Sequence, residues 1–465
     1  MIPFKRIFRR WVPAVLLGFC LVQARAERGP VSGREPDRTN PILPGYDADP
    51  SIVQADGKFF IYATLDPWGG DTLGCWESSD FKNWTFRELN WPTKAACTSP
   101  ESAGSKVWAP AVVRGPDGRF YMYVSVGSEI WAGVADHPLG PWKDLLDGRP
   151  LISRNFRDGY HMIDADVFTD DDGQVYLYWG SGLSWETMES TCWIVKLAPD
   201  MKTLVGEVKG VKLPHYLEGP VMVKRHGRYF LMYSWGNTTK DTYQVHYAVG
   251  DSPFGPFKEA DAPILKTDSG SNVVSPGHHT VFSYQGDDYI LYHRHSIPFD
   301  RLGRQVCIDP LQISADGTMK VIGPGHDAPS FTQGRNESRR DLTEKSTITA
   351  SGHGENASPE LAFDNNYATR WTGESANAWL QIDLGKPTQV NGHMIRPEYA
   401  WKKYAFRLEY SLDGNEWRVL EDYTGKPVSG SPIEMDKPVS ARFFRIAFRE
   451  GDGMAEPSIL EWHLL

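Results

Sequence analysis

Five segments of the chain share an alternating pattern in which a glycine is followed by aromatic and aliphatic residues. Alternation of this kind is typical of β-strands that bury their side chains. A short apolar run and a polar turn precede each segment, which predicts a β-hairpin in each unit. The opening glycines step along the chain by 61, 55, 54 and 59 residues and are Gly57, Gly118, Gly173, Gly227 and Gly286.

A repeat of this length accommodates one four-stranded sheet. Five such sheets closed into a ring form a five-bladed β-propeller, which leaves no long sheet edge exposed. We predict this propeller over residues 27–325 and a polar linker over 326–345. The remaining residues, 346–465, contain short alternating segments that are typical of a β-sandwich. The predicted fold class is therefore all-β, with a five-bladed propeller followed by a jelly-roll sandwich.

The first 26 residues have the character of a signal peptide. Basic residues come first, an apolar run follows at 11–22, and Ala24-Arg25-Ala26 has the small-residue pattern of a cleavage site. The apolar run is too short to span a bilayer, and no later segment is apolar enough to do so. We therefore expect a secreted or periplasmic protein with no membrane span.

The amino-acid composition agrees with a β-strand fold, and the net charge argues against one class of binding partner. The 465 residues include 17 Trp, 20 Tyr and 21 Phe, which suit pleated sheets, and 44 Gly and 33 Pro, which suit tight turns. The net charge of −10 argues against binding to nucleic acid. The four cysteines after the signal peptide form no Cys-x-x-Cys pair, and their pairing is left open. We expect a monomer.

Chemistry-bearing residues recur at one position of the repeat. Counting back eight or nine residues from the repeat glycines gives Asp49, Ala109, Asp164, Glu218 and His278. Equivalent positions on the innermost strands of a propeller converge on one end of the central axis. We therefore expect three carboxyl groups and one imidazole around a single funnel.

Such a group of acids fits glycosidic bond cleavage. One carboxylic acid protonates the leaving oxygen, while a carboxylate activates water or attacks directly. A third carboxylate can raise the pKa of the acid by repulsion between like charges. Trp108 and Trp235 are candidates for stacking against sugar rings, although packing between blades would also account for them.

The motifs around these positions resemble glycoside hydrolase family 43. They are Asp49-Pro50-Ser51-Ile52, Trp108-Ala109-Pro110, Ile163-Asp164-Ala165-Asp166, Glu218-Gly219-Pro220, Gly277-His278-His279-Thr280 and Tyr292-His293. The resemblance implies a five-bladed propeller that hydrolyses glycosidic bonds with inversion, mostly in arabinose- and xylose-containing plant polysaccharides.

The resemblance also implies a role for each residue. Asp49 would be the general base and Glu218 the general acid, while Asp164 would orient the acid and tune its pKa. His278 would lie near the channel centre and bind substrate, or hold calcium or its water. Arg304 would contact substrate.

Two neighbouring acids leave alternatives open. Asp166 follows Asp164 where the family pattern commonly has Ile-Asp-Pro, and it should share a face with Asp164, so either could be the modulator. Asp47 lies two residues before Asp49 and raises a similar question for the base.

The C-terminal region resembles the discoidin, or coagulation factor type C, domain, whose carbohydrate-binding relatives form carbohydrate-binding module family 32. Matching stretches are 362–371, 379–385, 410–417 and 441–445. The resemblance implies a structural calcium ion held by oxygens, which a hard cation prefers. The implied side-chain ligands are Asp364, Asn366, Thr369 and Glu461.

These observations favour an exported, inverting exo-glycosidase that acts on plant cell-wall glycans, with oligo- or polysaccharide as its partner. We expect it to be an α-L-arabinofuranosidase that requires no cofactor for its chemistry. Within the same fold, β-D-xylosidase and β-D-galactofuranosidase or galactosidase are alternatives. A non-catalytic carbohydrate-binding protein is the alternative from another class.

Overall fold

The computed structural model describes residues 40–182, 189–271, 273–296, 300–325, 327–333, 342–343 and 346–465. The predicted signal peptide and most of the predicted linker lie outside these ranges. The described residues form β-strands and short 3₁₀ turns, and none of their helices is long and apolar enough to cross a bilayer. The 3₁₀ turns are η1 (Arg154–Phe156), η2 (Ser269–Ser271), η3 (Ser330–Thr332) and η4 (Pro359–Ala362).

Five antiparallel four-stranded sheets follow one another along residues 47–321. The first is β1 (Asp47–Ala55), β2 (Lys58–Leu65), β3 (Gly74–Ser78) and β4 (Thr85–Arg87). The second is β5 (Val107–Arg114), β6 (Phe120–Val126), β7 (Glu129–Ala135) and β8 (Lys143–Asp144). The third is β10 (Asp166–Thr169), β11 (Val175–Trp179), β13 (Cys192–Leu197) and β14 (Leu204–Val211), beside a small pair, β9 (Tyr160–His161) and β12 (Ser181–Gly182).

The last two sheets complete the set. The fourth is β15 (Glu218–Arg225), β16 (Arg228–Trp235), β17 (Gln244–Gly250) and β18 (Phe257–Glu259). The fifth is β19 (Gly277–Tyr284), β20 (Asp287–Ser296), β21 (Asp300–Ile313) and β22 (Met319–Val321). The predicted glycine-plus-aromatic segments are the second strands of the five sheets, and each pairs with the strand before it as a hairpin.

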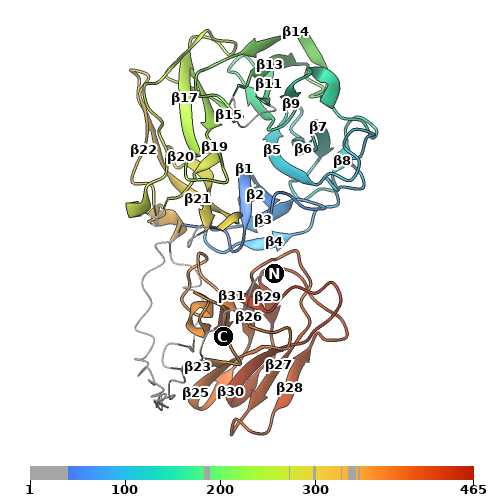
Figure 1. The fold of residues 1–465 in the computed structure, drawn as a ribbon, viewed down its shortest axis with the longest axis vertical. Coiled ribbons are helices and arrows are strands. Elements are labelled where there is room, and N and C mark those ends of the chain that lie inside the picture. Colours follow the sequence, from blue (N-terminus) through green and yellow to red (C-terminus); the bar gives the residue numbers. More distant parts are fainter. Residues whose placement is uncertain are drawn as a thin grey trace, which may run out of the picture.

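The innermost strands close a ring. β1 contacts β5, β5 contacts β10, β10 contacts β15, β15 contacts β19, and β19 returns to β1. Figure 1 shows the five sheets arranged around a central axis, so the predicted five-bladed propeller is confirmed. The segment before β1 joins the ends of the ring, because the side-chain amide of Asn40 donates to the Ile308 carbonyl at 2.9 Å and the backbone amide of Ile42 donates to the Val306 carbonyl at 2.9 Å.

The aromatic residues fill the space between blades. Trp76, Trp84, Trp131 and Trp179 are fully buried, and Phe59 packs edge-on against Phe282 of the fifth blade at a ring distance of 6.0 Å. Large flat side chains suit this space because neighbouring sheets meet face to face. The four cysteines of the described chain are free, buried thiols, namely Cys75, Cys97, Cys192 and Cys307.

Residues 346–465 form a second all-β unit of two sheets. A five-stranded sheet contains β23 (Thr347–Ala350), β25 (Trp379–Val390), β30 (Val439–Phe448), β27 (Phe406–Ser411) and β28 (Arg418–Asp422) in that order. A four-stranded sheet contains β24 (Trp371–Thr372), β31 (Ser458–Leu464), β26 (His393–Pro397) and β29 (Ile433–Met435). One apolar cluster fills the space between them, as expected for the predicted sandwich.

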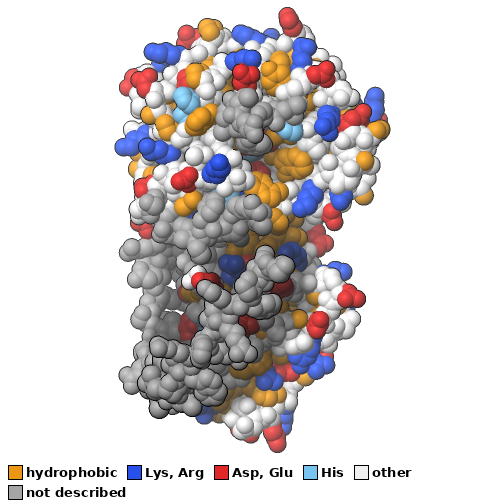
Figure 2. All heavy atoms as spheres, in the orientation of Figure 1, with side chains coloured by type: hydrophobic (Ala, Val, Ile, Leu, Met, Phe, Trp, Pro, Cys, Tyr) orange, Lys and Arg blue, Asp and Glu red, His pale blue; other side chains and the backbone are white. Residues whose placement is uncertain are grey.

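The four-stranded side of the sandwich rests against the first blade (Figure 1). The Phe86 amide donates to the Ser431 carbonyl at 2.7 Å, and Arg396 donates through Nη1 to the Trp84 carbonyl at 2.8 Å. Arg396 is buried, so this contact excludes water. On the face that Figure 2 shows, acidic and basic side chains are interspersed over both units.

Candidate active site

The start of each innermost strand contains an irregular, left-handed step. Asp49, Ala109, Asp164 and His278 have positive φ angles of 52°, 46°, 58° and 36°. Ladder pairing is interrupted after Ala48, Trp108, Glu218 and Gly277, as in a β-bulge. A non-glycine residue in this conformation is strained and persists only where its surroundings hold it.

Hydrogen bonds from the preceding blade hold these positions. The Ala109 amide donates to the Thr64 hydroxyl at 2.7 Å, the Asp164 amide to Ser125 at 2.9 Å, and the His278 amide to Ser234 at 2.8 Å. Each acceptor lies near the end of the second strand of its blade. The ring itself therefore fixes the direction in which the catalytic candidates point.

Glu218 departs from the register that the sequence predicts. In the fourth blade the left-handed residue is Gly219, with a φ of 59°, and Glu218 is the residue before it. Hairpin lengths differ by one residue between blades, so counting back from the repeat glycines could not detect this offset. Glu218 nevertheless reaches the same cavity, from one position earlier on its strand.

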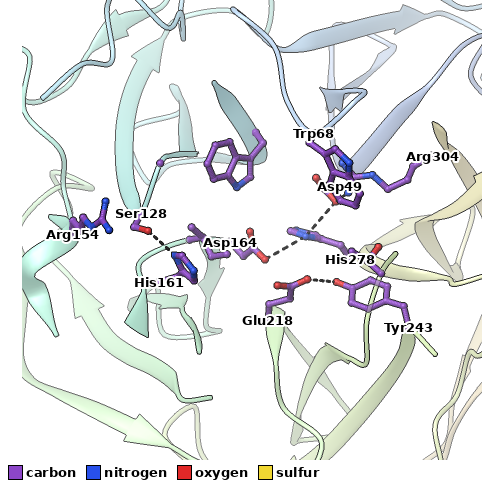
Figure 3. Close-up of a pocket in the computed structure, with 14 residues that line it drawn as sticks. Asp49, Trp68, Ser128, Arg154, His161, Asp164, Glu218, Tyr243, His278 and Arg304 are labelled. Atoms are coloured by element: carbon purple, nitrogen blue, oxygen red, sulfur yellow. Dashed lines mark hydrogen bonds and ion pairs between the residues drawn. The ribbon is translucent and has the colours of Figure 1, made fainter. Parts of the chain in front are cut away.

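A cavity of about 450 Å³ lies at the centre of the ring, and all five blades contribute to its wall. Figure 3 shows the polar residues of this wall facing one another across it. The lining residues are Asp49, Trp68, Trp108, Gly127, Ser128, Arg154, His161, Ile163, Asp164, Glu218, Thr238, Tyr243, His278 and Arg304.

Asp49 is surrounded by donors. The Thr64 hydroxyl donates to its Oδ2 at 2.7 Å, while Arg304 Nη1 and His293 Nδ1 both lie 3.0 Å from its Oδ1. Burial alone would raise the pKa of Asp49, but Arg304, His278 and His293 outweigh it and hold the pKa well below its usual range. Asp49 is therefore ionised throughout the physiological pH range.

Arg304 is buried and held on three sides. It donates through Nε and Nη2 to Asp66, with the shortest contact at 2.7 Å, and its guanidinium carbon lies 4.5 Å from the centre of the Trp68 ring. Pairing with two carboxylates compensates for the burial of the charge. Arg304 therefore faces the cavity in a fixed orientation, with its Nη1 on Asp49.

Glu218 has the opposite electrostatic environment. Burial raises its pKa to about 7, against the hydrogen bond that Tyr243 donates to its Oε1 at 2.7 Å. Burial, together with the charges of Glu218 and Asp49, also raises the pKa of Asp164. The Gly219 amide donates to Asp164, which ties Asp164 to the backbone beside Glu218. Two neighbouring buried carboxyls cannot both ionise easily, so the pair retains a proton near neutral pH.

His278 lies between the two sides of the cavity. Its Nδ1 is 3.4 Å from Asp49 Oδ1 and 3.5 Å from Asp164 Oδ2 (Figure 3). Burial lowers the pKa of His278 in spite of the neighbouring Asp49, so the ring is neutral near pH 7. A neutral imidazole can hold one carboxylate by its N–H and leave the other nitrogen as an acceptor.

The two alternative acids lie outside the cavity lining. Asp166 accepts a hydrogen bond of 3.1 Å from the Met222 amide, so it joins the third blade to the fourth. Asp47 accepts one of 3.1 Å from the Trp76 indole, and burial raises its pKa to about 8. Both have structural contacts in this arrangement, whereas Asp49 and Asp164 face the cavity.

The two predicted tryptophans are placed differently. Trp108 lines the cavity. Trp235 is not among the lining residues, and its ring lies edge-on to His215 at 5.1 Å and to His246 at 6.3 Å. Trp235 therefore packs against these two histidines rather than facing the cavity.

Several lining residues have no counterpart in the sequence prediction. Trp68 and Tyr243 lie in connections between strands, where the repeat has no fixed register. Asp66, which holds Arg304 from outside the lining, belongs to the same connection as Trp68. Ser128 and His161 share a 2.6 Å hydrogen bond on the side of the cavity away from Arg304, with Arg154 beside them (Figure 3). Only the aromatic and charged character of these loops could have suggested them.

Two clusters of side chains have the composition of metal sites, one rich in oxygen and one rich in nitrogen. In the sandwich, the Thr369 hydroxyl donates to Asp364 Oδ2 at 2.7 Å, and Glu461 forms a side-chain hydrogen bond with Asp364. Asn366 belongs to the same turn, since its amide donates to Asp364 at 3.0 Å. Burial raises the pKa of Asp364 to about 6. The side-chain oxygen of Asn366 accepts a hydrogen bond of 3.0 Å from the Ala368 amide. Two carboxyl groups and a hydroxyl buried together at this turn form an oxygen donor set that fits calcium.

The second cluster is His215, His246 and Glu259, whose ligand atoms lie within 4.8 Å of one another. The two imidazole rings are stacked, with an angle of 6° between their planes. The nitrogen lone pairs lie in the ring planes, so parallel rings do not converge on one ion. This cluster is a ring stack with a hydrogen bond of 3.1 Å from His215 to Glu259.

Comparisons with known proteins agree with this geometry. The profile of glycosyl hydrolases family 43 matches residues 38–319, and that of the F5/8 type C domain matches residues 347–462. A β-D-galactofuranosidase of Aspergillus niger is 34% identical over 302 residues, which cover 61% of this chain and 84% of that protein. An arabinoxylan arabinofuranohydrolase of Bacillus subtilis is 26% identical over 363 residues, which cover 68% and 70% of the two chains.

Among solved structures, one described as a glycoside hydrolase aligns with a TM-score of 0.76 and 26% identity, covering 93% of this chain and 100% of that one. The alignment therefore spans both units. The family match covers more than half of the chain and runs through the five blades to the first residue of β22. The protein belongs to glycosyl hydrolase family 43 and carries a C-terminal F5/8 type C domain.

Proposed function

We propose that the protein is an exported, inverting exo-glycosidase that releases terminal α-L-arabinofuranose from plant cell-wall glycans. One observation carries the proposal: carboxyl groups with opposite pKa shifts share one cavity. Asp49 is held well below its usual pKa, whereas the pKa of Glu218 is raised to about 7. When the environments of two carboxyl groups shift their pKa values in opposite directions, one group can act as a base and the other as an acid.

In the proposed reaction, water loses a proton to Asp49 as its oxygen attacks the anomeric carbon. The bond from that carbon to the glycosidic oxygen breaks, and the leaving oxygen takes the proton of Glu218. Asp164 orients Glu218 through the Gly219 amide, and repulsion between the two carboxyl groups raises the pKa of the pair. Arg304, Trp68 and Trp108, which line the cavity, hold the sugar. Exchange with solvent then restores both protonation states.

Exo action is supported by the shape of the site. Residues from all five blades surround the cavity, so the end of a glycan enters it more easily than the middle of a chain. The volume of about 450 Å³ lies in the range of small-ligand sites.

β-D-galactofuranose is a second candidate substrate, because the Aspergillus relative is a galactofuranosidase at 34% identity. Its ring has the same configuration as α-L-arabinofuranose and carries one additional exocyclic carbon. The deciding experiment compares nitrophenyl α-L-arabinofuranoside, β-D-galactofuranoside, β-D-xyloside and β-D-galactoside. We expect the highest kcat/KM for the arabinofuranoside; hydrolysis of none of the four would favour a non-catalytic carbohydrate-binding protein.

We further propose that a structural calcium ion is held by Asp364, Asn366, Thr369 and Glu461. The ion would neutralise two buried carboxyl groups and join the turn after η4 to β31. Calcium or water at His278 is a further proposal, supported by the two carboxylates beside that ring.

We also propose that residues 1–26 direct export. N-terminal sequencing of the secreted protein would test this proposal.

A further inference from the structure

A second cavity, of about 660 Å³, lies between the first blade and the sandwich. We call it the interdomain groove. Its lining residues are Asp71, Thr72, Phe86, Glu88, Leu89, Thr93, Lys94, Ala95, Thr98 and Gly104 of the propeller and Trp401 of the sandwich.

The interdomain groove opens at the same end of the first blade as the active site. Leu65, at the end of β2, pairs with Asp47 at the start of β1, so the connection 66–73 leaves the blade beside the catalytic Asp49. Arg87, at the end of β4, pairs with Cys75 near the start of β3. The residues that follow β4 therefore emerge at that end too.

One connection lines both cavities. Trp68 belongs to the wall of the active site, and Asp71 belongs to the interdomain groove. Three residues of chain reach at most about 11 Å. Gly70 fixes the connection to the second blade, because it exchanges hydrogen bonds of 3.0 and 3.3 Å with Val107.

Trp401 lies on the sandwich side of the interdomain groove and is held there by aromatic contacts. Its ring packs edge-on against Tyr399 at 5.4 Å, and Tyr399 contacts Tyr46 of the propeller at 5.7 Å. Trp401 also packs against the apolar cluster of the first blade but remains half-buried. The sandwich therefore contributes an aromatic side chain to a groove whose other wall continues into the active site.

The lining suits an uncharged, hydroxyl-rich chain. A tryptophan supplies a flat apolar face for sugar C–H groups, while Thr72, Thr93 and Thr98 supply hydroxyl groups. Asp71 and Glu88 are balanced in part by Lys94, so the groove has no strong preference for ions.

We propose that the interdomain groove is a distal glycan subsite: it binds the polysaccharide main chain whose terminal side-chain sugar occupies the active site, with Trp401 as its stacking surface. This inference rests on the proposed function, because it assumes that the active site takes a terminal sugar. It gives the C-terminal domain a direct part in substrate recognition.

Two variants test the groove in different ways. Trp401→Ala removes the stacking surface, and Ala95→Arg fills the groove from an exposed position without removing a packed side chain. Trp417→Ala is the matched control, because Trp417 precedes β28 in the sheet that faces away from the propeller and stacks on Arg445 at 3.9 Å (Figure 1). Thermal unfolding checks the folding of each variant.

Each variant is assayed on the preferred nitrophenyl glycoside and on a polysaccharide bearing the same terminal sugar, arabinoxylan for arabinofuranose or galactomannan with galactofuranose side chains. We expect kcat/KM on the polysaccharide to fall about tenfold in both groove variants, as for the loss of a contact worth about 1.4 kcal/mol. Hydrolysis of the nitrophenyl glycoside should stay within twofold of wild type, and the control should match wild type on both substrates.

Equal losses on both substrates would overturn the inference, as would wild-type activity on polysaccharide in either groove variant. Affinity electrophoresis in gels containing arabinoxylan separates this proposal from the enzymatic one. If the wild type hydrolyses nothing but is retarded, and both groove variants migrate freely, the groove binds glycan and the proposed activity fails. If the wild type hydrolyses arabinoxylan and the variants are retarded as strongly as it is, the groove proposal fails alone.

Discussion

The phenolic hydroxyl of Tyr243 donates a hydrogen bond of 2.7 Å to Oε1 of Glu218. Both residues are buried, and burial raises the pKa of Glu218 to about 7. A hydrogen bond donated to a carboxylate stabilises its charged form, so Tyr243 opposes the effect of burial. The structure therefore adjusts the pKa of Glu218 to the range in which it can both donate and regain a proton.

Replacing Tyr243 with Phe should move the alkaline limb of the kcat/KM profile to higher pH. Loss of the donor raises the pKa of Glu218 further, so the acid stays protonated at pH values where the wild type has lost its proton. The measurement is kcat/KM on a nitrophenyl glycoside from pH 5 to 9. Tyr233→Phe is the control, because its hydroxyl donates to Glu259 instead. A limb that stays in place, or moves to lower pH, would contradict this assignment.

Substitution of the two catalytic candidates should respond differently to the leaving group. Glu218→Gln removes the acid and should lower kcat/KM by about 10²–10⁴-fold on a natural glycan. A dinitrophenyl glycoside needs little protonation, so that variant should hydrolyse it nearly as well as the wild type. Asp49→Asn should lose activity on both substrates. Equal dependence on the leaving group in the two variants would argue against separate roles.

Asp164 and Asp166 can be separated by their pH profiles. Asp164→Asn removes a carboxyl group that repels the charged form of Glu218, so the pKa of Glu218 should fall and the alkaline limb should move to lower pH. Asp166→Asn should leave the limb in place, because Asp166 contacts the Met222 amide. A shift in Asp166→Asn without one in Asp164→Asn would exchange their assignments.

Calcium should stabilise the C-terminal domain. Burial raises the pKa of Asp364 to about 6, above its value of about 3.9 in an unfolded chain. Without calcium, the free energy of unfolding should therefore fall as pH rises through this interval. At 100 times its Kd, calcium should add about 2.7 kcal/mol. Calorimetry with and without a chelator measures this effect, and Asp364→Asn should abolish it. If the unfolding temperature of the wild-type domain does not change with calcium, the proposed site is wrong.

The fold was largely predictable because each blade repeats the same alternation of glycine, aromatic and aliphatic residues. The glycine that opens each segment lies in or beside the turn before the second strand, and the buried aromatic residues alternate along that strand. The sandwich strands were recognisable by the same alternation at Phe406–Ser411. The docking of the two units was not predictable, since contacts such as Arg396 with the Trp84 carbonyl join positions 312 residues apart.

The candidate site was predictable only where the repeat has a register. Asp49 and Asp164 were found because they occupy equivalent left-handed positions. Glu218 was found although it lies one residue before that position. Asp66 and Tyr243 were missed because they come from connections of variable length. Trp235 was selected by residue type alone, and its ring lies against His215.

The stereochemistry of the first-formed product tests the central claim most directly. Proton NMR can follow the anomeric signal during the first minutes of hydrolysis of nitrophenyl α-L-arabinofuranoside, before the free sugar equilibrates. If Asp49 activates water opposite the acid Glu218, the β-anomer should appear first and the α-anomer only later. Initial release of the α-anomer would require a covalent intermediate and would contradict the roles assigned to both carboxyl groups.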